Sequence, residues 1–88
     1  MSKWHTYDIP KGELGQLSKI KEELDEAYDA ETQGQTLMLM FELSDIIGAC
    51  GLVAQRYGMS LDDLVTFAKK RGQVARAEAD EKRTRLDS

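Results

Sequence analysis

Leu37-Met-Leu-Met-Phe-Glu-Leu-Ser-Asp-Ile-Ile-Gly-Ala-Cys-Gly-Leu-Val-Ala54 is one of the most apolar stretches of the chain, and only Glu42, Ser44 and Asp45 carry polar side chains in it. A helix this apolar is normally buried on most sides. A carboxylate buried without a partner is costly, so it neutralises, pairs with a cation or binds a metal. The nearest base on the same predicted helix is Arg56, about three turns after Asp45. The counter-charge must therefore come from elsewhere.

A second acid pair, Glu23 and Glu26, precedes this stretch with the same i, i+3 spacing as Glu42 and Asp45. Residues three apart on a helix lie on one side, about 5 to 6 Å between Cβ atoms. If the two helices are antiparallel neighbours, the two pairs can face each other and form an all-oxygen site. Such ligands suit Mg²⁺, with Mn²⁺ as an alternative, and two ions could share the four acids. A metal held in this way can promote hydrolysis of a phosphate ester or anhydride.

Each acid pair also has a purely structural interpretation. Lys19 stands four residues before Glu23, so the first pair fits an ordinary solvated helix face with ion pairs. On a helical wheel, Glu23 and Glu26 flank the apolar stripe, which would place any site at the edge of the packed face. Glu42 and Asp45 could form a buried ion pair with a base from another helix, although one carboxylate would then stay unmatched.

The rest of the sequence predicts an all-α fold, a helical bundle of three main helices followed by a polar C-terminal segment. The first helix, residues 13–31, repeats apolar residues at steps of three and four: Leu14, Leu17, Ile20, Leu24, Ala27 and Tyr28. Gly34 is expected to end it, and a second helix over residues 36–57 is expected to end at Gly58. Because the connection is short, these two helices should be antiparallel neighbours.

The chain divides into an arm, a helical domain and a tail. Residues 1–12 contain the only proline and should be irregular, residues 13–71 form the helical domain, and the mixed-charge residues 72–88 form a tail that is either helical or disordered. Ser60 and Asp63 predict a capping box at the start of the third helix. That helix should turn Leu61, Leu64, Val65 and Ala68 inward and carry Lys69, Lys70 and Arg71 near its C-terminal end, where bases suit the helix dipole.

Size and charge narrow the class of protein. Eighty-eight residues form one small domain that buries a modest fraction of its surface, so we expect oligomerisation to complete the core. The net charge of −4 argues against a nucleic-acid partner. The single cysteine, Cys50, excludes an intrachain disulfide and reads as a small core residue. The start lacks the apolar segment of a signal peptide, and acids near the centre of the apolar stretch disfavour a membrane span, so we expect a cytoplasmic protein.

The acid motifs carry a resemblance to a known family. Glu22-Glu23-x-x-Glu26, followed after fifteen residues by Glu42-x-x-Asp45, resembles the E-E-x-x-E…E-x-x-D signature of MazG-like all-α nucleoside triphosphate pyrophosphohydrolases, a superfamily that includes dimeric dUTPases. The order of elements agrees, with Tyr57-Gly-Met-Ser-Leu-Asp-Asp-Leu leading to Lys69-Lys-Arg71. The resemblance covers residues 13–71.

The resemblance implies hydrolysis of an NTP or dNTP to the monophosphate and pyrophosphate, in a homodimer or homotetramer with active sites near the subunit interface. The family's Mg²⁺ ligands match Glu23, Glu26, Glu42 and Asp45, and its first acid, a water-orienting catalytic group, matches Glu22. Candidates to bind the substrate are Lys19, Lys69, Lys70 and Arg71 for the phosphates, and Trp4, with His5 and Tyr7, for stacking on the base.

Other interpretations remain beside the family's activity. The arm aromatics could simply cover a subunit surface, and His5 could serve as a general base. The whole chain could be a non-enzymatic helical interaction module with a structural metal or an ion-pair cluster. It could also hydrolyse another phosphoanhydride, such as an alarmone.

Overall fold

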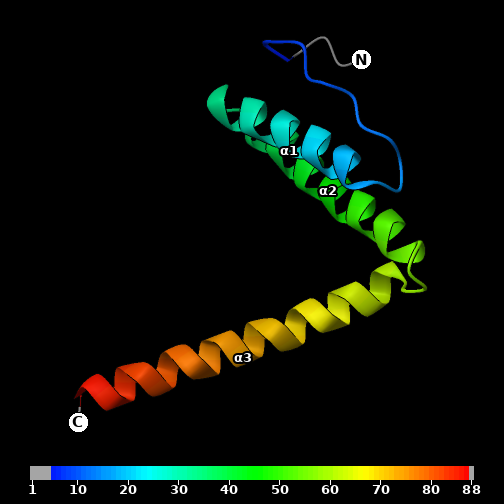
Figure 1. Cartoon of the computed structure of the whole chain (residues 1–88). Helices are drawn as coiled ribbons and strands as arrows, with labels where there is room; N and C mark the ends of the chain where they lie inside the picture. Colours follow the sequence, from blue (N-terminus) through cyan, green and yellow to red (C-terminus); the bar gives the residue numbers. More distant parts are fainter. Residues whose placement is uncertain (1–4, 88) are drawn as a thin grey trace.

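The computed structural model describes residues 5–87, and within this range the chain is entirely helical apart from its arm and connections. The helices are α1 (Leu17–Thr32), α2 (Thr36–Gln55) and α3 (Leu61–Asp87). Figure 1 shows α1 and α2 packed side by side and antiparallel, whereas α3 leaves the end of α2 as one long helix. The predicted all-α fold with three main helices is confirmed.

The ends of α1 and α2 follow the predicted glycine signals. Gly34 and Gly58 adopt positive φ angles of +71° and +81°, which side chains with a Cβ rarely tolerate. After α1, the Gln35 N–H donates to the Ala30 carbonyl at 3.0 Å, the closing bond of a Schellman motif. Short, sharp turns of this kind bring α2 back along α1.

The N-terminal arm is irregular, as predicted, and it runs back along α1. The Tyr7 hydroxyl donates to the Asp25 carbonyl at 3.3 Å, and the Gly12 N–H donates to Glu22 Oε1 at 2.8 Å. A Cβ at Gly12 would overlap the main chain of Ser18, so only glycine permits this approach. A turn over residues 13–16 separates the arm from α1, which therefore begins four residues later than the predicted start at residue 13.

The buried apolar core of the described chain consists of small side chains only: Ala27, Ala30, Ala49 and Ala54. The predicted apolar stripe of α1 is instead largely exposed, with Leu17 at 71 % and Tyr28 at 59 %. The prediction that this stripe is the packed face was wrong for the single chain. Alanines let two helices approach closely, and they leave the large residues on the outside, where nothing in the described chain covers them.

The third helix is longer than the sequence suggested. It passes through Gly72 without a break and continues to Asp87, so residues 72–87 take the helical alternative. Strong helix formers such as Ala75, Ala77 and Ala79 outweigh the one glycine. Lys69, Lys70 and Arg71 consequently lie in the helix interior, and the expectation that they sit at a helix C-terminus was wrong.

Where α3 leaves α2, the two helices form an open apolar groove of about 550 Å³. The residues that line it are Ile46, Ile47, Cys50, Leu61, Leu64, Val65, Ala68 and Lys69. The predicted inward face of the third helix therefore does lie toward α2, but it is only partly covered. Cys50 is half-buried rather than enclosed.

By length and composition alone, α2 is apolar enough to cross a membrane. Core helices of soluble bundles share these properties, so the feature is weak support for a membrane span. In this structure the middle of α2 packs against α1 through Glu42 and Ala49, which are both buried.

The predicted capping box starts α3. The Asp63 N–H donates to Ser60 Oγ and the Ser60 N–H donates to Asp63 Oδ2, both at 3.0 Å. We predict that Ser60→Ala lowers the free energy of unfolding by about 1 kcal/mol, because one N–H of the first turn loses its acceptor. Urea unfolding followed by circular dichroism measures this change. Asp62→Asn, in the same turn but outside the capping box, should have the smaller effect, and equal effects would contradict the prediction.

Candidate functional site

The structure brings the two predicted acid pairs together across the α1–α2 interface. Glu23, Glu42 and Asp45 each offer a carboxylate oxygen, and these three oxygens lie within 4.8 Å of one another. Glu22, Glu23 and Glu26 form a second such group on α1. We call these five residues the acid cluster.

Three members of the acid cluster, Glu22, Glu23 and Glu42, are as buried as core residues. Glu23 is 7 % exposed and Glu42 is 6 % exposed, and the Oε2 atom of each is buried without a hydrogen-bond partner. The expectation that Glu23 only flanks the packed face was wrong, because the alanine contacts turn this side of α1 toward α2. Buried carboxylate oxygens without partners are costly and are suited to binding a cation.

Lys19 supplies part of the counter-charge. Its Nζ lies 3.1 Å from Glu23 Oε1 and 3.2 Å from Glu22 Oε2. Burial opposes the charge of Lys19, but the hydrogen bonds to Glu23 and Glu22 outweigh it and raise the lysine pKa. Among the described residues, no lysine or arginine forms an ion pair with Glu42 or Asp45, so the predicted alternative of a buried pair with a base from another helix does not form.

The lack of a counter-charge changes the protonation of Glu42. Burial, followed by the neighbouring carboxylate of Glu26, raises the pKa of Glu42 to about 8. Burial also raises the pKa of Glu26, although its hydrogen bond with Glu42 opposes the change. Without a cation, Glu42 therefore holds a proton at neutral pH, and a bound cation would take the place of that proton.

Glu22 has a different environment from the other acids. Its Oε1 accepts from the Gly12 N–H and its Oε2 pairs with Lys19, so both oxygens have partners. Burial opposes ionisation, but these two hydrogen bonds outweigh it and lower the pKa of Glu22. Glu22 is thus placed to hold the arm and Lys19 in position.

His5 and Asp29 also adjoin the acid cluster, and the sequence did not identify either of them as a ligand of a site. His5 Nδ1 lies 2.8 Å from Asp29 Oδ2, and His5 Nε2 lies 3.8 Å from Glu26 Oε1. His5, Glu26 and Glu42 also offer three ligand atoms within 4.8 Å of one another. The sequence signal was the spacing of Asp29, which follows Glu26 by three residues, but nothing local predicted that the arm would return to it.

A groove opens beside the acid cluster. It has a volume of about 360 Å³, and Lys19, Glu23 and Asp45 give it a polar wall. The other lining residues are Leu14, Ser44, Gly48, Ala49 and Leu52. A small polar molecule can therefore reach the carboxylates from solvent.

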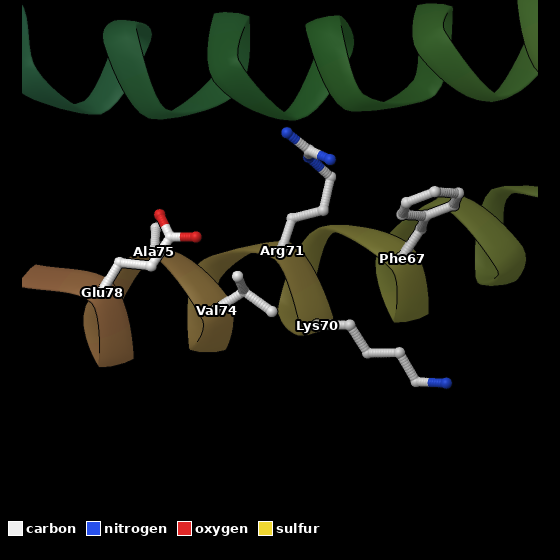
Figure 2. A pocket seen from close by; sticks show the side chains of 6 residues that line it. All are labelled: Phe67, Lys70, Arg71, Val74, Ala75 and Glu78. Atoms are coloured by element: carbon white, nitrogen blue, oxygen red, sulfur yellow. The ribbon is translucent and has the colours of Figure 1, made fainter.

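The structure does not bring the α3 bases to the acid cluster. Lys69 lines the groove between α2 and α3, whereas Lys70 and Arg71 line an open groove along α3 with Phe67, Val74, Ala75 and Glu78. Figure 2 shows Arg71 extending toward the side on which α2 runs, and Lys70 extending away from it. No hydrogen bond or ion pair joins these bases to the acids within residues 5–83. Trp4 lies outside the described residues.

The donor set fits a hard divalent cation. The ligand atoms of Glu23, Glu26, Glu42 and Asp45 are all carboxylate oxygens, and two of these residues contribute buried oxygens without partners. Mg²⁺ and Mn²⁺ prefer such oxygens. The geometry defines an all-α protein with a candidate divalent-cation site between two antiparallel helices. No protein-family model, curated protein or solved structure matches the chain.

The raised pKa of Glu42 predicts a pH dependence of stability in metal-free protein. The pKa rises from 4.5 in the unfolded chain to about 8, so the folded state binds more protons between these values and the free energy of unfolding falls as pH rises through them. We expect Glu42→Gln to remove this dependence and to stabilise the protein above about pH 8 by on the order of 2 kcal/mol.

Urea unfolding at several pH values, in the presence of a chelator, measures the effect. Glu31→Gln is the control, because Glu31 is an exposed acid on the neighbouring helix α1 and lies outside the acid cluster. It should leave the pH dependence of the wild type unchanged. A Glu42→Gln curve parallel to that of the wild type would contradict the assigned environment of Glu42.

Proposed function

We propose that this protein is a Mg²⁺-dependent nucleoside triphosphate pyrophosphohydrolase, which converts an NTP or dNTP and water to the monophosphate and pyrophosphate. The observation that carries the proposal is that acids of two helices converge, Glu23 with Glu42 and Asp45 and Glu26 with Glu42, and that Glu23 and Glu42 have buried oxygens that lack partners. The resemblance of the acid motifs to MazG-like enzymes supports the same activity. Mn²⁺ is an alternative ion, since it accepts the same ligands.

The four carboxylates would hold the ion, which would supply positive charge beside the phosphates and lower the pKa of water. Glu42 contributes by giving up the proton that it holds in the metal-free state. The hydrogen bonds that Glu22 accepts from Gly12 and Lys19 favour its ionised form. The second of these bonds holds Lys19 at the edge of the groove. Glu22 can also orient a water molecule toward the substrate.

Lys19 is the base of the described chain best placed to offset phosphate charge. It lines the groove with Glu23 and Asp45 and is therefore next to any phosphate held by the ion. Its raised pKa keeps it charged at the pH of the reaction. Lys69, Lys70 and Arg71 could approach a triphosphate from a second subunit, because their own α3 does not carry them to the acid cluster.

The activity test is a panel of NTPs and dNTPs incubated with Mg²⁺, in which release of pyrophosphate and monophosphate is measured. Wild-type protein should release pyrophosphate from at least one member, and Glu42→Gln should lower turnover at least a hundredfold, by about 3 kcal/mol in the barrier, because the ion loses a charged ligand. Glu31→Gln should retain wild-type turnover.

The outcomes separate the activity from its alternatives. Release of inorganic phosphate or of another product pattern would indicate a different phosphoanhydride substrate. Stabilisation by Mg²⁺ without turnover of any nucleotide would indicate a helical interaction module with a structural ion. The absence of both turnover and a Mg²⁺-dependent rise in melting temperature would refute the proposed enzymatic function.

We also propose that the active form is a homodimer or homotetramer. The described chain buries four alanines as its apolar core and leaves many large apolar side chains exposed, including Leu37, Met40, Phe41, Leu43, Ile47 and Phe67. Contiguous exposed apolar surface of this kind marks a protein interface. A second copy would cover α2 and the groove between α2 and α3.

Multi-angle light scattering tests this proposal. We expect wild-type protein to have at least twice the monomer mass of 9.9 kDa. Ile47→Asp should shift the mass toward the monomer, because a charge would be buried at the interface. Gln55→Asp, which changes an exposed polar residue of the same helix, is the control and should not. A wild-type mass of 9.9 kDa at micromolar concentration would rule out the oligomer.

A further inference from the structure

We propose that His5 is an additional ligand of the divalent cation, and that Asp29 is the positioning residue that orients its imidazole. This inference rests on the cation site of the proposed function and adds to it a nitrogen donor from the N-terminal arm. The geometry that supports it is the group formed by His5, Glu26 and Glu42, whose ligand atoms lie within 4.8 Å of one another.

The first step of the argument concerns Asp29. Its carboxylate is 2 % exposed and accepts hydrogen bonds from the Thr6 N–H, the Thr6 hydroxyl and the Gln33 side-chain amide. Donors therefore face both oxygens of Asp29, which acts as a carboxylate that accepts hydrogen bonds and donates none.

The second step fixes the tautomer of His5. Because Asp29 can only accept, the 2.8 Å contact requires that His5 Nδ1 carries a proton and donates it to Asp29 Oδ2. In neutral imidazole the lone pair then lies on Nε2, the atom that lies 3.8 Å from Glu26 Oε1. A carboxylate that holds the Nδ1–H of a ligating histidine is a common arrangement in metal sites.

The third step concerns what lies between Nε2 and the acids. A nitrogen lone pair and carboxylate oxygens repel each other unless a cation joins them. The His5 side chain is 6 % exposed and Glu42 is buried, so bulk water does not screen this repulsion. A divalent cation bound by Nε2, Glu26 and Glu42 satisfies all three groups. The competing occupant of this position is a proton.

The arm brings His5 to this place through contacts that do not involve the ligands. Thr6 binds Asp29, and the Gly12 N–H binds Glu22, so the arm is attached to α1 on both sides of Glu26. A nitrogen ligand shifts preference toward transition ions, because imidazole suits them whereas Mg²⁺ prefers oxygen. The site should therefore bind Mn²⁺ more tightly than Mg²⁺.

The experiment uses the full chain without a histidine tag, loaded with Mn²⁺ in the absence of nucleotide. His5 is the only histidine of the protein, so any imidazole-nitrogen coupling detected by pulsed electron paramagnetic resonance belongs to it. We expect this coupling in the wild type and its loss in His5→Asn, whose amide can still donate to Asp29. Titration calorimetry should show Mn²⁺ affinity falling roughly ten- to a hundredfold in this variant, with Mg²⁺ affinity changed far less.

Two further variants separate ligation from docking of the arm. Asp29→Asn should weaken or abolish the nitrogen coupling, because the carboxylate that orients His5 is removed. Thr6→Val, which loosens the arm but keeps both His5 and Asp29, should retain the coupling and most of the Mn²⁺ affinity. Thermal unfolding of each variant confirms that it is folded.

Mn²⁺-loaded wild type without nitrogen coupling would overturn the proposal. Equal losses of Mn²⁺ and Mg²⁺ affinity in His5→Asn would also overturn it. Because no nucleotide is present, these results do not depend on the proposed activity. A protein that shows the coupling but hydrolyses no triphosphate keeps this inference and loses the enzymatic function.

Discussion

Mutual repulsion among carboxylates buried between α1 and α2 is the constraint on which the rest of the structure depends. Glu23 and Glu42 are buried, while Lys19 is paired with Glu22 and Glu23. One lysine cannot balance the acid cluster, so Glu42 holds a proton or the cluster holds a cation. A cation bound by the acid cluster would therefore stabilise the helix interface, which links the fold to the candidate site.

The alanines of the interface explain why such a site can exist in a short chain. Ala27, Ala30 and Ala49 let the two helices approach closely enough for the acids of both to meet. The same choice leaves few large side chains in the core, and burial of apolar area is the main source of stability. The close approach of the helices thus brings the acids together but reduces the burial of apolar area. A bound ion or a partner subunit would add stability to such a protein.

Local chemistry in the sequence was enough to predict the helices and the acid pairs. Glycines at positive φ and the Ser60–Asp63 capping box act within a few residues, and i, i+3 spacing sets which acids share a helix side. The sequence did not predict which side of α1 is buried, because the apolar stripe and the acidic side of α1 compete for contact with α2. It also missed the pairing of His5 with Asp29, a contact across 24 positions that depends on the path of the arm.

The path of the arm gives the acid-rich side of α1 a second use. Glu22 and Asp29 bind the arm, whereas Glu23 and Glu26 point toward the cluster, so neighbouring acids on one helix divide between the two tasks. Their protonation follows this division: hydrogen bonds from the arm lower the pKa values of Glu22 and Asp29, whereas burial among other acids raises those of Glu26 and Glu42. A run of acids that looks uniform in the sequence thus contains two acids that anchor the arm, Glu22 and Asp29, and two acids with raised pKa values, Glu26 and Glu42, which are candidate ligands of a cation. The anchors hold His5 and Lys19 beside the ligands, so an arm without secondary structure still belongs to the site.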